Sequence, residues 1–316
     1  MKIISTSPSF AKYSKEPIEY LHKYGIQAEY LPANMGEDEF INRIQEADGL
    51  IVAFTQINSR VLDNAPKLKI ICKHGVGVDN IDLEEARKRN IYVTNVPNAN
   101  KHAVADFAFG LVLSAARQIP QANELTKKGK WPRIFGTDVY GKTIGIIGLG
   151  NIGKQVALRA KGFNMRVLAY DPYPDREFAG RNEIEFLSFE ELLKQSDFVT
   201  IHIPLVEKTK NLIDLSKLKL MKSTAYLINA SRGGIVAESD LYRALKEKII
   251  SGAAIDVFSE EPVKTNSLFE LPNFIASPHI AGYTAEAVNA LGMTCVENII
   301  NVLIKKSTPN FIVNGL

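Results

Sequence analysis

Residues 143–171 read TIGIIGLGNIGKQVALRAKGFNMRVLAYD, and this stretch decides the fold. A short apolar run is followed by a glycine turn, a segment with helical periodicity and a second apolar run that ends in Asp171. A strand, a helix and a second strand in that order are typical of a parallel α/β sheet.

Three glycines, Gly148, Gly150 and Gly153, form the pattern G-x-G-x-x-G between the first predicted strand and the helix. The first glycine allows a tight turn, the second lets the backbone approach a pyrophosphate, and the third lets helix and strand pack closely. The start of the helix adds free N–H donors. The pattern therefore predicts a dinucleotide site. The alternative is a glycine turn that only packs a helix.

Asp171 lies about 20 residues after the glycines, where an acidic side chain binds the ribose hydroxyls of the adenosine. Its carboxylate would repel a 2′-phosphate, and the Pro172-Tyr173-Pro174 segment that follows has no cation to bind one. We therefore expect NAD as the cofactor in preference to NADP. In the alternative interpretation, Asp171 is an ordinary turn residue.

The alternation of strands and helices continues on both sides of this unit. Upstream, strands are predicted at 2–5, 27–31, 49–54, 68–72 and 91–94, with helices at 16–24, 37–46, 83–89 and 103–116. Downstream, strands are predicted at 197–203, 224–229, 252–258 and 273–277, with helices at 238–248 and 284–305. A polar connector is expected at 121–140. The pattern indicates two doubly wound parallel-sheet α/β domains.

Composition excludes several classes of protein. The 38 basic and 35 acidic residues are spread along the chain, so nucleic acid has no preferred footprint. No run approaches 18 uncharged apolar residues and the N-terminus lacks the apolar stretch of a signal peptide, so we expect no membrane partner. Cys72 and Cys295 lie in apolar segments, which suits buried thiols in the cytoplasm. No Cys/His cluster has ligand spacing, so no metal site is expected.

With a domain before the glycine pattern and further signatures after it, the sequence resembles the D-isomer-specific 2-hydroxyacid dehydrogenase family. The matching segments are 75–79, 148–153, 229–234, 254–262 and 277–279. The resemblance implies a flavodoxin-like substrate-binding domain, residues 1–98 with 288–316, and a Rossmann NAD-binding domain, residues 99–287. It also implies hydride transfer between NAD(H) and a 2-keto or 2-hydroxy acid.

Arg232 follows the predicted strand 224–229, at the carboxyl edge of the sheet where ligands of such folds bind. The fixed fork of donors on arginine suits a carboxylate. The resemblance implies that Arg232 grips the substrate carboxylate and polarises the carbonyl oxygen. A surface salt bridge is the alternative.

Glu261 and His279 each follow a predicted strand, and ends of adjacent strands bring such residues together. The resemblance implies that His279 exchanges the proton on the substrate oxygen while Glu261 holds it. A carboxylate beside an imidazole favours the protonated ring. Glu260 is the neighbour that competes for the role of Glu261. His202 lies in a segment that lines the cofactor in the family and is not expected to be catalytic.

Gly75, Val76 and Gly77 offer consecutive N–H groups in a tight turn, an anion-binding nest suited to the substrate carboxylate. An ordinary loop is the alternative. The resemblance implies that Asp256 holds the nicotinamide carboxamide. Further cofactor contacts are implied for Val76, Asn151, Ile152, Ile203, Ala230, Ser231, Arg232, His279 and Gly282.

The 3-phosphoglycerate dehydrogenase branch is the closest look-alike, through residues 116–122 and 129–131. That branch has a phosphate-binding arginine where this chain has Ala53, which argues against a phosphorylated substrate. Arg60 and Arg133 remain alternative phosphate contacts, the latter across a dimer. No regulatory domain is expected after Leu316.

Two further expectations concern partners. We expect a homodimer formed through the helix 103–116, whose apolar positions exceed one stripe; a helix buried in its own chain is the alternative. A protein that only senses NAD, as in corepressors that resemble these dehydrogenases, is the alternative to an enzyme.

Overall fold

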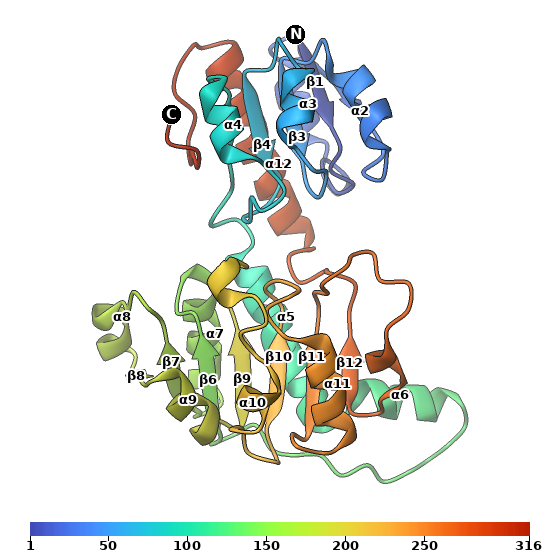
Figure 1. Ribbon diagram of the computed structural model, residues 1–316, viewed down its shortest axis with the longest axis vertical. Coiled ribbons are helices and arrows are strands. Elements are labelled where there is room, and N and C mark those ends of the chain that lie inside the picture. Colours follow the sequence, from blue (N-terminus) through green and yellow to red (C-terminus); the bar gives the residue numbers. More distant parts are fainter. The chain divides into compact units, whose positions relative to one another are not determined.

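The computed structural model describes all 316 residues and divides into two compact units (Figure 1). Unit 1 comprises Met1–Asn100 and Tyr283–Leu316, and unit 2 comprises Lys101–Gly282. Each unit contains its own parallel sheet with helices on both faces. The predicted fold class is therefore confirmed. No helix combines the length and the apolar character needed to cross a bilayer.

Unit 1 is built on a five-stranded parallel sheet in the order β2-β1-β3-β4-β5. Its strands are β1 (Lys2–Ser5), β2 (Gln27–Tyr30), β3 (Gly49–Val52), β4 (Ile70–Lys73) and β5 (Tyr92–Thr94). All five lie where the sequence predicts them, with ends shifted by at most two residues. In this flavodoxin-like order, ligands bind at the carboxyl ends of the strands near the β1/β3 switch point.

Helices cover both faces of this sheet. They are α1 (Glu16–His22), α2 (Glu37–Ile44), α3 (Ser59–Asp63), α4 (Leu83–Lys88) and α12 (Ala285–Leu303). α2, α3 and α4 bury apolar side chains on one face, and α1 and α12 bury theirs on the other. α3 was not predicted because five residues are too few to show a helical period. Its start is marked by Asn58, whose side chain accepts a hydrogen bond from the Val61 N–H.

The segment after α12 runs along β5, the edge strand of this sheet. Ile312 pairs antiparallel with Thr94. The Asn314 side chain accepts a hydrogen bond from the Val93 N–H at 3.2 Å and donates one to the Ile91 carbonyl at 2.8 Å. These contacts occupy backbone groups that an edge strand otherwise leaves open.

The two cysteines lie on different elements of unit 1, Cys72 on β4 and Cys295 on α12. Both are free and buried, as predicted. Burial raises the pKa of the Cys295 thiol well above its ordinary value, and contact with Cys72 adds to the effect. The Cys295 thiol is therefore protonated, and both cysteines serve as small apolar side chains in the core.

His74 is a buried histidine just after β4, with an exposed fraction of 6%. Its Nδ1 lies 3.0 Å from the Ser7 hydroxyl. Burial lowers the pKa of His74 to about 4, and the nearby Lys73 charge adds to this against the opposing effect of the Val288 carbonyl. The imidazole is therefore neutral at physiological pH.

Because the unfolded chain binds a proton on His74 at higher pH than the folded chain, the fold should lose stability as pH falls from about 6.5 to 4. We expect His74 to account for about 2.5 kcal/mol of the loss between pH 7 and 4.5. Urea unfolding at both pH values should show a smaller loss for His74→Asn than for wild type. His22→Asn, at an exposed histidine, is the control. Equal losses in His74→Asn and wild type would contradict the prediction.

Unit 2 contains a seven-stranded parallel sheet in the order β12-β11-β10-β9-β6-β7-β8. The strands are β6 (Thr143–Ile147), β7 (Arg166–Tyr170), β8 (Glu185–Phe186), β9 (Phe198–Ile201), β10 (Tyr226–Asn229), β11 (Gly252–Ile255) and β12 (Phe274–Ala276). The order reverses between β6 and β9. That switch point is where doubly wound sheets bind dinucleotides.

The helices of unit 2 form two layers (Figure 1). They are α5 (Lys101–Arg117), α6 (Ile119–Lys127), α7 (Asn151–Lys161), α8 (Arg176–Arg181), α9 (Phe189–Gln195), α10 (Leu215–Leu218) and α11 (Glu238–Lys246), with short 3-10 turns η1 (Glu207–Thr209) and η2 (Ser267–Glu270). α5 and α7 pack on one face of the sheet, and α9, α10 and α11 on the other. α5 packs against α7 and β10. Burial within its own unit therefore explains its excess of apolar positions.

α6 corrects one expectation, because residues from 121 onward were predicted to be a polar connector. Gln118 takes a left-handed backbone with φ 50°, which separates α5 from α6. Pro120 then lies in the first turn of α6, where a missing N–H costs nothing. The prediction was wrong because a proline that ends one helix also suits the start of the next.

Candidate active site

All seven strands of unit 2 end at the same edge of the sheet, because all are parallel. Most predicted site residues of this unit lie at that edge. The segments after β6, β7, β9, β10, β11 and β12 carry, in that order, Gly148–Gly153, Asp171, Ile203, Ala230–Arg232, Asp256 and His279. The edge therefore brings together the dinucleotide pattern and the residues predicted to be catalytic.

The glycine turn after β6 is held in place by close contacts. Gly148 has φ 95°, and a Cβ there would lie 2.6 Å from the His202 carbonyl oxygen. A Cβ at Gly153 would lie 2.0 Å from the Gly148 carbonyl oxygen, so α7 packs directly on the turn. A Cβ at Gly150, in contrast, would meet no atom within 4 Å. Gly148 and Gly153 thus allow the turn to pack against the residues around it, whereas Gly150 leaves open space beside its backbone.

The groups around this open space suit a dinucleotide. Gly150 caps α7 without a side-chain hydrogen bond, so the helix start can receive a pyrophosphate. Asp171 accepts hydrogen bonds from the N–H groups of Leu149 and Tyr173, both at 2.8 Å. A carboxylate offers about four acceptor positions, so Asp171 retains capacity for two ribose hydroxyls. The residues present therefore fit NAD.

His202 adds a buried polar group beside the turn. Its Nε2 lies 2.9 Å from the Thr200 hydroxyl, whereas its Nδ1 is buried without a hydrogen-bond partner. Burial lowers the pKa of His202 to about 4, so the ring is neutral. An unpartnered buried nitrogen at the switch point is a second feature that suits a bound dinucleotide.

Glu261 and His279 form the central contact of the edge. His279 Nδ1 lies 2.7 Å from Glu261 Oε2, and the side chains are 31% and 30% exposed, respectively. An ionised carboxylate only accepts hydrogen bonds, so Nδ1 carries the hydrogen in this contact. Glu261, and not Glu260, therefore partners the histidine.

The pKa of Glu261 is lowered in this arrangement. Burial alone would raise it, but the hydrogen bond and charge of His279, the Phe258 N–H and the charge of Arg232 together outweigh burial. The carboxylate therefore stays ionised to a lower pH than an exposed glutamate. The charge of Arg232 thus favours the ionised form of Glu261.

Asp256 organises the turn that carries His279. Its Oδ1 accepts hydrogen bonds from the Ser277 hydroxyl at 2.6 Å and the Ile280 N–H at 3.1 Å, and its Oδ2 accepts one from the Ala281 N–H at 2.9 Å. The side chain is fully buried. These bonds hold His279 from both sides, at a left-handed φ of 54°. A contact with the nicotinamide remains a prediction.

Asn229 shapes the turn that carries Arg232. Its Nδ2 donates to the Arg232 carbonyl at 2.9 Å, and its Oδ1 accepts from the Ser231 N–H and hydroxyl at 3.0 and 2.7 Å. A Cβ at Gly233 would lie 1.8 Å from the Phe258 carbonyl oxygen. Only glycine therefore lets the Arg232 turn lie against the start of the Glu261 loop.

Gly75, Val76 and Gly77, the predicted anion nest, belong to unit 1 and follow β4. The Gly75 carbonyl accepts a hydrogen bond from the Val96 N–H at 2.9 Å, and the Val76 carbonyl accepts one from Asn95 Nδ2 at 2.7 Å. These bonds fix the turn through its carbonyl groups. Its N–H groups as anion donors remain a prediction.

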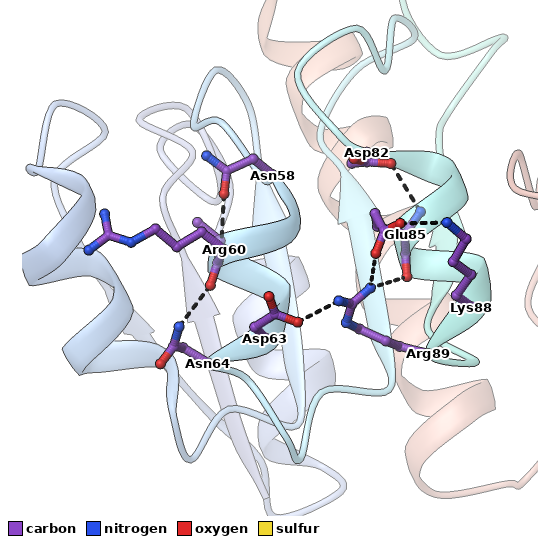
Figure 2. A network of polar contacts seen from close by, with 9 residues as sticks. Asn58, Arg60, Asp63, Asn64, Asp82, Glu85, Lys88 and Arg89 are labelled. Atoms are coloured by element: carbon purple, nitrogen blue, oxygen red, sulfur yellow. Dashed lines mark hydrogen bonds and ion pairs between the residues drawn. The ribbon is translucent and has the colours of Figure 1, made fainter.

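Arg60 was one alternative source of a phosphate contact. Its guanidinium pairs with Glu37 at 2.8 Å and with Asp38 at 2.5 Å on the exposed surface of unit 1. In Figure 2 it points away from the neighbouring network in which Arg89 bridges Asp63 and Glu85. Its charge is therefore already balanced by two carboxylates.

Ala53 is the residue expected at the position of the phosphate-binding arginine of the phosphoglycerate branch. It follows β3 and is buried, and its carbonyl accepts a hydrogen bond from the Lys73 ammonium. Lys73 also donates to Asn80 Oδ1 at 2.6 Å. Two of the hydrogen bonds of the Lys73 ammonium are thus made to neutral oxygens, the Ala53 carbonyl and the Asn80 amide.

The other residues predicted to contact the cofactor lie on the same edge of unit 2, apart from Val76 in unit 1. Asn151 and Ile152 begin α7, and Ile203 follows β9. Ala230 and Ser231 follow β10, and Gly282 closes the unit. Their roles as cofactor contacts stay predictions.

Three residues that hold the site were not predicted from sequence. Asn229 and Ser277 lie inside the matching segments, but no pattern assigned them a role. Glu238 begins α11 and bonds the loop that carries Glu261. Acidic residues are common in the first turn of any helix, so the sequence offered no signal that distinguishes Glu238.

The chain is similar to one protein family and to several named dehydrogenases and reductases. Residues 109–281 match the family described as D-isomer specific 2-hydroxyacid dehydrogenase, NAD binding domain. The chain is 43% identical over 307 residues to the D-3-phosphoglycerate dehydrogenase of Methanocaldococcus jannaschii, covering 96% of this chain but 57% of that relative. It is 42% identical over 280 residues to the glyoxylate reductase of Korarchaeum cryptofilum, covering 86% of this chain and 84% of the relative.

A solved structure with bound ligands is also similar. The D-lactate dehydrogenase of Aquifex aeolicus, complexed with NAD and lactic acid, superposes with a TM-score of 0.85. The identity is 27%, and the match covers 100% of both chains. The similarity therefore extends through both units.

Proposed function

The chain belongs to the D-isomer-specific 2-hydroxyacid dehydrogenase family, with residues 109–281 as its NAD-binding domain, and on that premise we propose that it is a 2-hydroxyacid dehydrogenase. It transfers hydride between NAD(H) and a small 2-oxo acid, and the product of reduction is the D-2-hydroxy acid. The observation that carries the proposal is the 2.7 Å contact between His279 and Glu261 beside Arg232.

Each of these three side chains has a step in the reduction. Bound NADH supplies the hydride for the carbonyl carbon. His279, held through Nδ1 by Glu261, donates the proton from Nε2 to the carbonyl oxygen. Arg232 binds the substrate carboxylate and stabilises the charge that develops on the oxygen. Oxidation of the hydroxy acid reverses these steps, with His279 as the base.

We assign substrate binding to residues 1–98 with 288–316 and cofactor binding to residues 99–287. The flavodoxin-like order of the sheet in unit 1 supports the first assignment, because such sheets bind ligands at the carboxyl ends of their strands. Gly75, Val76 and Gly77 follow one of those ends and are the proposed donors to the carboxylate.

The cofactor preference gives a prediction at Asp171. Its carboxylate accepts ribose hydroxyls and repels a 2′-phosphate, so Asp171→Ala should weaken NADH binding and reduce the preference for NADH over NADPH by about tenfold or more. Titration of both cofactors by fluorescence measures the change. Asp175→Ala, which removes a carboxylate that pairs with Lys154, is the control. An unchanged preference in Asp171→Ala would remove the argument for NAD at this residue.

For the substrate, we propose an unphosphorylated 2-oxo acid such as glyoxylate or hydroxypyruvate. Two features of unit 1 support this choice: Ala53 is expected where the phosphoglycerate branch has its phosphate-binding arginine, and the Arg60 guanidinium is paired with Glu37 and Asp38. The glyoxylate reductase relative matches over most of its length. 3-Phosphoglycerate dehydrogenase is the second candidate, because the Methanocaldococcus relative matches nearly the whole of this chain.

The deciding experiment follows NADH absorbance after mixing the protein with pyruvate, glyoxylate, hydroxypyruvate, 2-ketoisocaproate and 3-phosphohydroxypyruvate in turn. The proposal expects turnover, with an unphosphorylated acid preferred. Preference for the phosphorylated acid would support the second candidate and point to Arg133. No turnover with any acid, together with tight NADH binding, would favour a protein that only senses NAD.

We also propose a homodimer, formed through the surface of α6 and the connector that follows it. Trp131 and Phe135 on that connector are 77% and 89% exposed, and Ile119 on α6 is 52% exposed. Gln118, next to Ile119, donates a hydrogen bond from Nε2 to the Phe135 carbonyl, which holds the connector at the start of α6. Large exposed apolar side chains grouped in this way are typical of protein interfaces. Light scattering should give twice the mass of the chain, and Trp131→Glu with Phe135→Glu should give the monomer.

We place the enzyme in the cytoplasm. The two free, buried cysteines support a reducing compartment. Fractionation with an antibody to the protein tests this placement.

A further inference from the structure

The loop that carries Glu261 has no regular structure of its own between β11 and η2. One oxygen of Glu261 accepts a hydrogen bond from the Phe258 N–H at 2.9 Å, and the other bonds His279. The first bond is local to the loop and moves with it. The position of Glu261 relative to His279 therefore depends on what holds the loop.

Glu238, the first residue of α11, reaches this loop with both carboxylate oxygens. Its Oε1 accepts hydrogen bonds from the Ser259 N–H and the Ser259 hydroxyl, both at 2.7 Å. Its Oε2 accepts one from Asn266 Nδ2, also at 2.7 Å. Ser259 precedes Glu261 and Asn266 follows it, so a single carboxylate holds the loop on both sides of Glu261.

Both ends of this clamp are themselves fixed. α11 buries Leu241, Ala244 and Leu245 in the core of unit 2, which holds the helix that bears Glu238. Asn266 Oδ1 accepts a hydrogen bond from the Leu268 N–H at 3.0 Å at the start of η2, so its amide group has one orientation. The clamp therefore joins a packed helix to the Glu261 loop.

We propose that Glu238 is a positioning residue for the reaction: it holds the Glu261 loop against α11 so that Glu261 keeps its contact with His279. An effect of Glu238 on catalysis rests on the proposed function. The contact between Glu261 and His279 that Glu238 maintains is present without substrate. Glu238 touches neither His279 nor the reacting atoms and acts only through the loop.

A positioning role predicts a change in the titration of His279, whereas a role in global stability alone does not. Glu261, on the loop after β11, contacts this histidine directly. Asp256, at the start of that loop, bonds the Ile280 and Ala281 N–H groups that follow His279, and the charge of Arg232, on the turn after β10, acts on Glu261. If the loop loosens, Glu261 leaves the imidazole and the protonated ring loses its partner. A lower global stability alone would not change the titration of His279 in the folded protein.

The test is an NMR pH titration of the His279 ring in the full-length chain, assigned with the His279→Asn spectrum. Glu238→Gln keeps the size of the side chain but places an NH₂ group against the Asn266 amide or the Ser259 donors. We expect the midpoint of the His279 titration to move to lower pH, in the same direction as for Glu261→Gln, because the protonated ring loses its carboxylate partner. In the steady-state reduction of the preferred acid, kcat should fall about tenfold with the KM for NADH unchanged.

Asp240→Asn is the matched control. Asp240 is a second carboxylate on α11, and it accepts a hydrogen bond from the Leu215 N–H at 2.9 Å. The bond holds α10 and not the Glu261 loop, so the titration of His279 should be unchanged. Ser259→Ala, which removes one of the three donors at an exposed position, should give a smaller shift in the same direction as Glu238→Gln.

Two results would separate the possible failures. A folded Glu238→Gln variant with the wild-type His279 titration would overturn the positioning role; if that variant does not fold, an unshifted Ser259→Ala does the same. A shifted titration in a protein whose wild type reduces none of the tested acids would instead uphold the positioning role and reject the proposed function.

Discussion

His279→Ala should reduce kcat by about 10³-fold while the dissociation constant for NADH stays within a few-fold of wild type. In the proposed mechanism Nε2 of this histidine donates the proton, and the loss of a general acid weakens transition-state stabilisation more than cofactor binding. Stopped-flow reduction and fluorescence titration of NADH measure the two quantities separately. Turnover at the wild-type rate would show that the mechanism is wrong.

Two companion variants make this result specific. His279→Asn retains a residue that accepts the left-handed φ of 54°, so a loss of activity there reports chemistry and not backbone strain. Glu261→Gln should reduce kcat by a smaller factor, since the histidine remains. Glu260→Gln changes the adjacent carboxylate, which does not contact His279, and should leave the rate unchanged. Equal losses in the two glutamine variants would contradict the assignment of Glu261.

Gly233→Ala should reduce kcat/KM by about 100-fold or more, although Gly233 carries no functional group. The added Cβ would lie 1.8 Å from the Phe258 carbonyl oxygen and 2.0 Å from its carbon, and this backbone must move to accept it. The movement displaces the Arg232 turn and the Glu261 loop from each other, and misplacement by about 1 Å can cost two orders of magnitude in rate.

The control for this variant is Gly180→Ala on α8, where a Cβ would meet no atom within 4 Å. That variant should keep both activity and melting temperature. Gly233→Ala is expected to bind NADH through the distant glycine turn and yet to reduce substrate slowly. Wild-type kcat/KM in Gly233→Ala would show that the two loops tolerate separation.

The sequence predicted features set by local patterns and by the order of the strands, but not the hydrogen bonds made by irregular turns and loops. The glycine turn and Asp171 are local to one βαβ unit, so spacing alone placed them at the switch point. Glu261 and His279 lie on neighbouring strand ends, and the parallel sheet brings them together as expected. The contact of Asp256 with the nicotinamide remains a prediction. Its bonds to Ser277, Ile280 and Ala281 were not predicted, because they depend on a turn that no periodicity describes.

Short helices and supporting residues were missed for the same physical reason. α3 has one turn beyond its cap and α6 begins with a proline, so neither shows the apolar period that identifies longer helices. Glu238 supports a loop 21 residues away through hydrogen bonds to polar groups. A side chain of this kind resembles any surface glutamate until the fold brings its partners together.

The contacts of Asn314 with β5 also affect how copies of the chain behave when concentrated. An uncovered edge strand invites strand addition from another molecule, the first step of aggregation. At β5, the Asn314 amide is hydrogen-bonded to the Ile91 carbonyl and the Val93 N–H, so these backbone groups cannot pair with a strand of another molecule. The opposite edge, β2, is blunted differently, because Glu29 is held in ion pairs with Lys2 and Arg43. We therefore expect neither edge strand to promote fibril growth. At β5 the Asn314 amide forms hydrogen bonds that an added strand would need, and at β2 the charged side chains disfavour strand addition.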